Sequence, residues 1–288
     1  MRSEPVGESA PQTAKVQRRI GTTIQYVLLT LAAIVVLFPM YLAVVNSLHP
    51  LEKIFSYPPS LFVTDPQWSN YVDVFDIAPI GRYLVNSFLV SALITVGQVA
   101  TSVLAAYAFA FLRFPLRTVL FALFLSTLMV PWEVTIIPNY ETVESLGWLD
   151  SYQGLTVPFL ATAFGTFLLR QAFLSIPRDL LDAAALDGAG HLGVMRHVAI
   201  PLGRPAIAAL AVFSFLSAWN QYLWPLLITN DDTYRTVQIG LKTLASQSVD
   251  SVNLVMAGTV IAAAPTFILL VVFQRHLIRG ISAGGVKG

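Results

Sequence analysis

Long apolar segments separated by short polar ones dominate the pattern of this 288-residue chain. Five of these segments contain no Lys, Arg, Asp or Glu, and a sixth contains a single acid, Glu133. Because an α-helix rises about 1.5 Å per residue, roughly 20 apolar residues cross the ~30 Å hydrocarbon layer of a bilayer. The pattern therefore predicts an all-α integral membrane protein with six transmembrane helices, at residues 20–48, 83–112, 118–140, 151–169, 205–230 and 251–274.

The polar segments divide the chain further. The first apolar segment is too long for the short core of a signal peptide, which indicates an uncleaved helix. The segment after it is rich in proline and aromatic residues and too polar to span, so we expect it to cover the outer ends of the bundle. The resulting organisation is an N-terminal segment 1–19, a first helix 20–48, an external loop 49–82, a core 83–280 with a loop at 177–205, and a tail 281–288.

The composition is that of a chain whose main solvent is lipid, with 56% hydrophobic and 11% charged residues. Cysteine is absent, which excludes disulfides and thiolate metal sites. The four histidines are scattered and lack the spacing of metal ligands. The chain also contains no G-x-x-x-x-G-K-S/T loop to cradle nucleotide phosphates. We therefore expect no cofactor or metal to be bound by this chain.

The basic residues predict how the chain is oriented, because cytoplasmic loops of membrane proteins carry an excess of Lys and Arg. Placing the N-terminus inside puts 13 of the 17 basic residues in the cytoplasm and leaves four outside: Lys53, Arg82, Arg235 and Lys242. The opposite orientation would invert this bias. We therefore expect both termini and the loop 177–205 to lie in the cytoplasm.

This cytoplasmic loop is charged and glycine-rich, and it carries its own helix signals. Pro177 suits the first turn of a helix, where its missing N–H costs nothing. Gly188 and Gly190 permit the chain to bend sharply after that helix. The expected structure is a helix, an elbow of small residues, and a second short helix over 191–198 that ends before Pro201.

The same loop carries a recognisable motif. Residues 182–189 read Asp-Ala-Ala-Ala-Leu-Asp-Gly-Ala, and Pro201-Leu follows. This order resembles the "EAA" loop of permease subunits in binding-protein-dependent ABC importers. Asp182 stands where that family usually has Glu, and Met195 stands where an aromatic is common; the charge and the apolar bulk are kept. The residues to which the resemblance assigns ATPase coupling are Asp182, Ala183, Ala184, Asp187, Gly188, Ala189 and Pro201.

The resemblance implies a fold, a set of partners and a compartment. The chain would have the fold of a type I ABC importer permease, multi-pass in a prokaryotic plasma membrane and surrounded by lipid. It would pair with a second permease, an ATPase dimer and an external solute-binding protein, with no role for nucleic acid. It would not itself be an enzyme, because ATP and Mg²⁺ bind the partner ATPase. Closure of that ATPase would move the coupling loop and switch the spans between inward-open and outward-open states.

Other segments narrow the resemblance to carbohydrate-uptake permeases related to the maltose importer, and among them to the second permease of glycerol-3-phosphate importers. These segments are residues 111–117, 128–134, 149–155, 219–225 and the tail 279–288. The resemblance implies glycerol-3-phosphate or a glycerophosphodiester as the solute. Close relatives carry oligosaccharides, so a sugar is the alternative.

Six residues are candidates for lining the solute path: Glu133, Trp132, Asn220, Gln221, Tyr222 and Trp224. An acid inside an apolar segment is costly and marks a functional site by default, although Glu133 could equally pair with a neighbouring helix. The aromatic residues could instead form an interfacial belt. If the third and fifth spans are straight, Glu133 and Asn220 both lie roughly 22 Å above the inner surface.

Two other classes of membrane protein compete with this interpretation. An ion-coupled secondary transporter would need paired intramembrane charges and discontinuous helices in two halves, and only Glu133 fits that requirement. A membrane scaffold that transports nothing would leave the coupling loop without a purpose.

Overall fold

The computed structural model describes residues 12–247 and 251–285, and within these ranges the only regular elements are helices. Continuous helices that are long and apolar enough to cross a membrane cover Gly21–Ser47, Ile80–Phe111, His191–Trp219 and Val252–Gln274. Two further pairs of helices meet the same requirement only if each bent pair crosses as one span. The all-α class is confirmed, and the six expected spans correspond to four continuous helices and two bent pairs.

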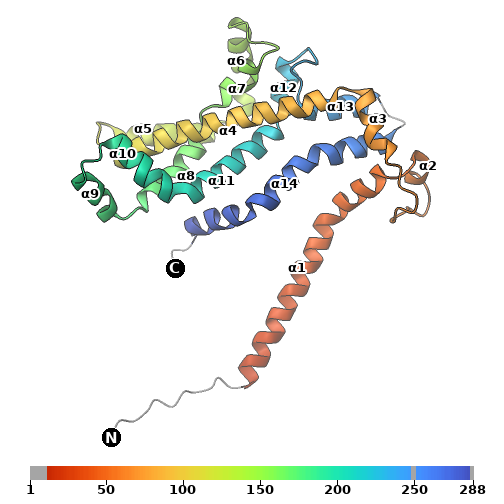
Figure 1. Cartoon of the computed structure of the whole chain (residues 1–288), viewed down its shortest axis with the longest axis horizontal. Helices are drawn as coiled ribbons and strands as arrows, with labels where there is room; N and C mark the ends of the chain where they lie inside the picture. Colours follow the sequence, from red (N-terminus) through yellow and green to blue (C-terminus); the bar gives the residue numbers. More distant parts are fainter. Residues whose placement is uncertain (1–11, 248–250, 286–288) are drawn as a thin grey trace.

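The helix α4 (Ile80–Phe111) is the spine of the molecule (Figure 1). It is uncharged after Arg82 and is buried at positions spaced three or four residues apart, so one face packs inside the bundle. The helices α8 (Ala163–Leu174) and α11 (Ile200–Trp219) pack along it, and α14 (Val252–Gly285) packs on α11.

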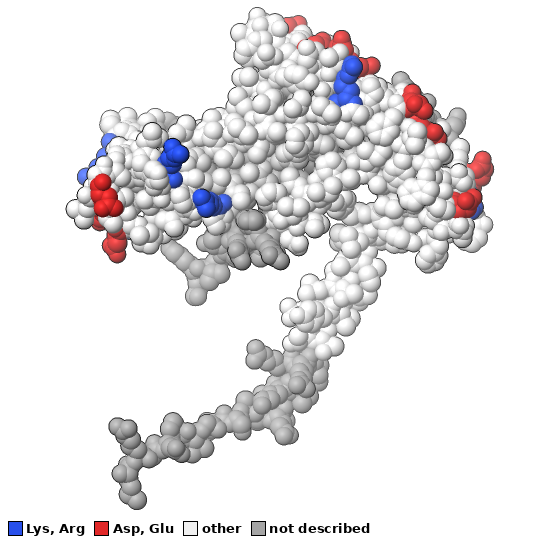
Figure 2. Space-filling model, in the orientation of Figure 1, with Lys and Arg blue, Asp and Glu red and all other residues white. Residues whose placement is uncertain are grey.

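The two ends of the spine carry different elements. The helices α9 (Arg178–Leu186) and α10 (His191–Val194) lie at one end, and α3 (Ser69–Ile77) and α13 (Val237–Gln247) lie at the other (Figure 1). Charged side chains gather over these two ends and over the projection that carries α6 and α12, whereas much of the remaining visible surface is free of charge (Figure 2). A broad uncharged belt between charged ends is what a bilayer requires. We call the end with α9 and α10 the inner end, following the distribution of basic residues in the sequence.

The third and fourth expected spans are not straight, which corrects the simple reading of the apolar pattern. The helix α5 (Arg117–Ser126) with the 3₁₀ turn η1 (Thr127–Met129) meets α6 (Trp132–Ser145) at 98°. The helix α7 (Tyr152–Thr156) with η2 (Val157–Phe159) meets α8 at 46°. Pro131 explains the first break: it cannot donate an N–H, and it holds Val130 in an extended conformation.

The fifth expected span is displaced along the sequence. It starts at His191, where α10 continues through the π turn η3 (Met195–Ala199) into α11, and it ends at Trp219 instead of reaching residue 230. The second loop helix was therefore predicted wrongly to end before Pro201. The change of hydrogen-bond register in η3 comes directly before this proline, so its missing donor is accommodated in a continuous helix. The chain resumes in α12 (Leu223–Ile228) after the break.

The first helix, α1 (Gln12–Ser47), leaves the bundle at an angle (Figure 1). It begins eight residues before the expected position, and its apolar side chains between residues 24 and 40 are exposed. Its outer end is anchored near the short helix α2 (Leu51–Ile54): Asn70 of α3 donates from Nδ2 to the carbonyl oxygens of Ser47 and His49. The expected tail at 281–288 is helical through Gly285, and its last three residues lie outside the described part of the chain.

Candidate coupling loop and translocation path

The coupling loop begins with α9, and its end is set by Gly188. The N–H of Gly188 donates to Ala185 O at 3.1 Å, and the N–H of Ala189 donates to Ala184 O at 2.9 Å. Gly188 itself has φ +77°. This pair of bonds around a left-handed glycine is the Schellman motif, which satisfies carbonyl groups that a helix end leaves free. Gly188 therefore forms the sharp bend that the sequence predicted.

The loop is held against the inner ends of the spans by apolar packing. Leu181 of α9 and Val194 of α10 pack on an inner core that includes the fully buried Phe173 of α8. Helices α8 and α11 lie very close together at this core: a Cβ added to Gly203 of α11 would lie 2.7 Å from Phe173 Cε1. The Tyr107 hydroxyl of α4 also lies 3.4 Å from His191 Nδ1. The loop therefore packs directly on the inner core that α8 and α11 help to form.

The opposite face of the loop presents leucines to solvent. Leu186 is 89% exposed and Leu192 is 72% exposed, and Leu180 is exposed as well. Exposed apolar side chains of this size are candidates for a contact with a protein or a membrane. Among the residues assigned to coupling, Asp182, Ala183, Asp187 and Gly188 are exposed and Ala184, Ala189 and Pro201 are partly buried.

In the outer half, the three breaks in the spans come together through three aromatic rings. Trp132 starts α6, Phe159 ends η2, and Trp224 lies in the first turn of α12. The ring centroids of Trp132 and Phe159 are 4.7 Å apart, and those of Trp132 and Trp224 are 5.7 Å apart. Trp224 is 2% exposed and donates from Nε1 to Gly154 O. Segments far apart in sequence thus share one aromatic cluster.

Polar side chains of α4 satisfy the backbone at the break between η2 and α8, and a side chain of α11 supports one of them. Gln98 donates from Nε2 to Phe159 O at 2.9 Å, and Thr101 donates to Leu160 O at 2.8 Å. Ser214 of α11 in turn donates to Gln98 Oε1 at 2.6 Å. Free backbone groups are very costly in a membrane, so these three side chains keep the break possible. Sequence reasoning missed them, although polar residues at spacings of three and four along 86–102 were a visible signal.

A second polar network fastens the outer loops to the spine. Asn86 of α4 donates from Nδ2 to Thr233 O and Arg235 O, and its Oδ1 accepts a bond from the Tyr152 hydroxyl. Asp150 Oδ1 accepts the N–H groups of Asn230 and Asp231. Hydrogen bonds from Thr233 lower the pKa of the Asp231 carboxyl. Asn86 and Asp150 were also missed, because their partners lie about 80 to 150 residues away.

The candidate path residues lie in the region of these breaks, but in different environments. Glu133 is exposed in the first turn of α6, and it forms no hydrogen bond or ion pair with any described residue. Asn220 is exposed and donates to Leu216 O, and Tyr222 is exposed. Gln221 is partly buried, with Oε1 lacking a partner in the described part of the chain. Trp132 is partly buried, and Trp224 belongs to the core.

The height of roughly 22 Å above the inner surface that a straight span predicts for Glu133 is wrong, because the 98° bend lies between Thr118 and Glu133. The first turn of α6 is nevertheless near the start of α12, since Trp132 contacts Trp224. Within the ranges that the structure describes, no group of three His, Cys, Asp or Glu side chains is arranged to hold a metal ion.

Comparison with known proteins places the geometry in context. Residues 98–283 match the family described as binding-protein-dependent transport system inner membrane component. The sn-glycerol-3-phosphate transport system permease protein UgpE of Yersinia pestis bv. Antiqua (strain Antiqua) is 38% identical over 264 residues, covering 89% of this chain and 94% of that protein. UgpE of Agrobacterium fabrum (strain C58 / ATCC 33970) is 39% identical over 277 residues, covering 92% and 97%.

Among solved structures, the chain is similar to part of a bacterial ABC transporter involved in the import of the acidic polysaccharide alginate. The TM-score is 0.79 at 24% identity, with 90% of this chain and 97% of that chain covered. At this identity the likeness shows a shared fold.

Proposed function

This chain belongs to the family of binding-protein-dependent transport system inner membrane components, and we propose that it carries sn-glycerol-3-phosphate or a glycerophosphodiester across the bacterial inner membrane. It is a permease subunit of an ABC transporter and not an enzyme. The observation that carries the choice of solute is the identity of 38–39% to proteins named for glycerol-3-phosphate transport, over about nine tenths of the chain.

The exposed leucines of α9 and α10 support docking of an ATPase subunit at the inner end. An ATPase groove that covers Leu186 and Leu192 would remove their apolar surface from water. ATP and Mg²⁺ would be bound there, on the partner. A second permease and an external solute-binding protein complete the proposed assembly; one structural neighbour is described in complex with a periplasmic protein.

The continuity of α10, η3 and α11 supports a route for the movement. One unbroken helix runs from His191 to Trp219, from the coupling loop to the break at Asn220. A shift of the loop by the ATPase would displace the outer end of this helix, and with it Tyr222 and the aromatic cluster. In this proposal the breaks are the positions where the path opens and closes.

Glu133 and Asn220 supply the polar groups of the proposed path. A carboxylate repels phosphate, so Glu133 would accept hydroxyl groups of the glycerol or attract the choline of a glycerophosphodiester. Asn220 donates from Nδ2 to Leu216 O, and its Oδ1 accepts no hydrogen bond from any described residue. Gln221 offers an acceptor, Oε1, that likewise has no partner among the described residues. The alternative solute is an oligosaccharide, which would use the same acceptors.

Uptake by the reconstituted complex tests this proposal. The complex is captured on the tagged full chain, placed in vesicles with its binding protein and ATP, and supplied with radiolabelled glycerol-3-phosphate, glycerophosphocholine or maltotriose. We expect uptake of the first two only. Uptake of maltotriose alone would establish the oligosaccharide alternative, and uptake driven by an ion gradient without ATP would contradict the importer class.

Two variants assign the path residues. Glu133→Gln should lower uptake of glycerophosphocholine more than uptake of glycerol-3-phosphate, and Asn220→Ala should lower both. Glu144→Gln, an exposed acid further along α6, is the matched control and should transport normally. Normal uptake of both solutes by both path variants, in complexes that assemble, would remove these residues from the path.

A further inference from the structure

A cavity of about 970 Å³ lies between the coupling loop and the inner ends of the spans. One wall is formed by α9 and α10, through Arg178, Leu181, Asp182 and His191. The other wall is formed by the end of α4, the start of α5 and the chain between them, which includes Arg113 and Arg117. The cavity therefore sits at the inner edge of the apolar belt, on the side of α9 that faces away from its exposed leucines.

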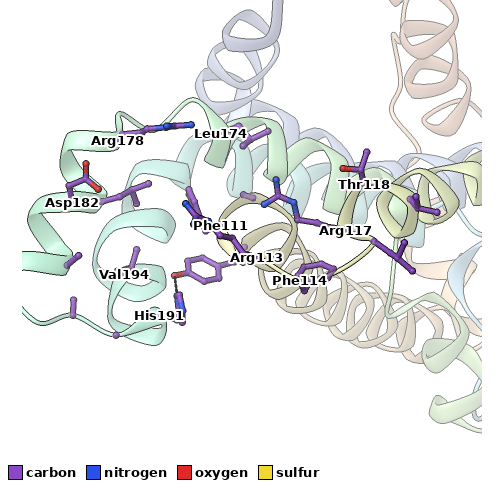
Figure 3. A pocket seen from close by; sticks show the side chains of 18 residues that line it. Phe111, Arg113, Phe114, Arg117, Thr118, Leu174, Arg178, Asp182, His191 and Val194 are labelled. Atoms are coloured by element: carbon purple, nitrogen blue, oxygen red, sulfur yellow. Dashed lines mark hydrogen bonds between the residues drawn. The ribbon is translucent and has the colours of Figure 1, made fainter.

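Among the described residues that line this cavity, positive charges outnumber negative ones. Three arginines from three parts of the chain, Arg113, Arg117 and Arg178, lie around one opening (Figure 3). Arg117 donates to Leu112 O, and Arg113 and Arg178 form no hydrogen bond or ion pair with any described residue. Asp182 is the single acid in the lining, and the ion pair found among described residues, Arg235–Asp232, is elsewhere. The cavity thus has guanidinium donors left over for an anion.

A separate apolar groove of about 560 Å³ lies further along α4, between α4 and the helix formed by η3 and α11. Both spaces use the same stripe of α4: Val99 and Val103 line the groove, and Tyr107 and Ala110 line the cavity. The spacing of three or four residues places these side chains on one helix face. The second wall also continues, from Val194 at the cavity to Met195 and Ile200 at the groove. A cationic cavity and an apolar groove therefore lie one after the other along the same two walls.

We propose that this pair of spaces binds an anionic phospholipid, with its phosphate in the cavity and an acyl chain in the groove. The phosphate accepts hydrogen bonds from Arg113 and Arg178, and basic pockets between spans on the cytoplasmic side bind such headgroups. A free phosphate ion would satisfy the cavity but not the apolar groove, which argues for a lipid. The bound headgroup links the chain between α4 and α5 to α9, so the lipid steadies the coupling loop.

Native mass spectrometry of the delipidated full chain in detergent tests this proposal directly. Phosphatidylglycerol, phosphatidylcholine, short-chain dihexanoyl phosphatidylglycerol and inorganic phosphate are titrated in turn. We expect phosphatidylglycerol to bind more tightly than the other three. The double variant Arg113→Gln with Arg178→Gln should weaken phosphatidylglycerol binding by roughly 30-fold, since each arginine near the surface contributes about 1 kcal/mol. The matched control, Arg196→Gln with Arg204→Gln, removes two exposed inner arginines outside the cavity and should leave binding unchanged.

The groove is tested separately by Ala100→Phe, which fills it without changing charge. This variant should weaken the binding of long-chain phosphatidylglycerol and leave the binding of the short-chain lipid unchanged. Ala122→Phe on the exposed helix α5 should change neither. Equal binding of phosphatidylglycerol and phosphatidylcholine would overturn the proposal. Tight binding of inorganic phosphate that is unchanged in Ala100→Phe would also overturn it. Loss of lipid on addition of the ATPase subunit would assign the cavity to a protein interface and would also overturn it. None of these readouts depends on which solute is transported.

Discussion

The inner end and the outer half of this permease place their apolar and polar residues in opposite ways. At the inner end, Leu186 and Leu192 face water while local backbone bonds around Gly188 close a helix. In the outer half, Trp224 is buried, and Gln98 donates to the backbone carbonyl of Phe159 at the break before α8. The inner surface therefore exposes apolar side chains, which we propose another protein covers. The outer half is built to keep an irregular backbone stable inside a membrane.

This contrast predicts which property of the protein a variant in each region should change. Changes in the outer half should reduce the stability of the chain, because they remove buried contacts that hold broken spans together. Changes at the inner loop should leave the chain folded and act mainly on its partner.

The largest effect is expected from Trp224→Ala. This change removes a buried ring that contacts Trp132 and Phe159, and such truncations cost about 3–5 kcal/mol of unfolding free energy. Thermal unfolding of the purified full chain should show a clear loss. Trp68→Ala, at a tryptophan that is 66% exposed, is the control and should stay near the wild type. Equal losses in both variants would show that the aromatic cluster does not support the breaks.

An intermediate effect is expected from Gln98→Leu. The new side chain has a similar size but leaves Phe159 O without its donor, and a buried group left unpaired costs about 1–3 kcal/mol. Ser214→Ala should cost less by itself, since it removes a donor to Gln98 only. The double variant should lose less unfolding free energy than the sum of the losses in the two single variants. Simple addition would mean that the two residues do not act as one network.

A smaller effect on stability is expected from Gly188→Ala. Its φ of +77° strains any residue with a Cβ, at about 1–2 kcal/mol, even though no atom lies within 4 Å of the added carbon. Gly190→Ala is the matched control, because Gly190 has φ −70° and equally open space. We expect lower ATPase stimulation by loaded binding protein for the variant at Gly188 only, with partial recovery in Gly188→Asn. The same stimulation in both alanine variants would exclude a role for this bend in coupling.

The first helix of the inner loop and the bend after it were predictable because their signals are local. Pro177 and Gly188 act on the residues beside them, so this helix and its elbow were read from one short stretch. The second loop helix was not, because the prediction ended it before Pro201 and it continues into α11. The prediction of a straight third span was wrong for a local reason too, because it did not take into account that Pro131 breaks the helix.

The hydrogen bonds at the outer breaks could not be predicted from the sequence, for a different reason. Gln98 and Phe159 are 61 residues apart, and their pairing depends on how the helices pack.

Cysteine labelling of Leu186 tests the central claim, that the inner leucines dock an ATPase. The native chain has no cysteine, so Leu186→Cys is the single target in inside-out vesicles, and Glu144→Cys on α6 is the outer control. An impermeant thiol reagent should label Leu186→Cys in the chain alone and much more slowly once the ATPase subunit is bound. Glu144→Cys should react only from the opposite side of the membrane. Labelling of Leu186→Cys at the same rate with and without the ATPase, or from the outside, would contradict the account.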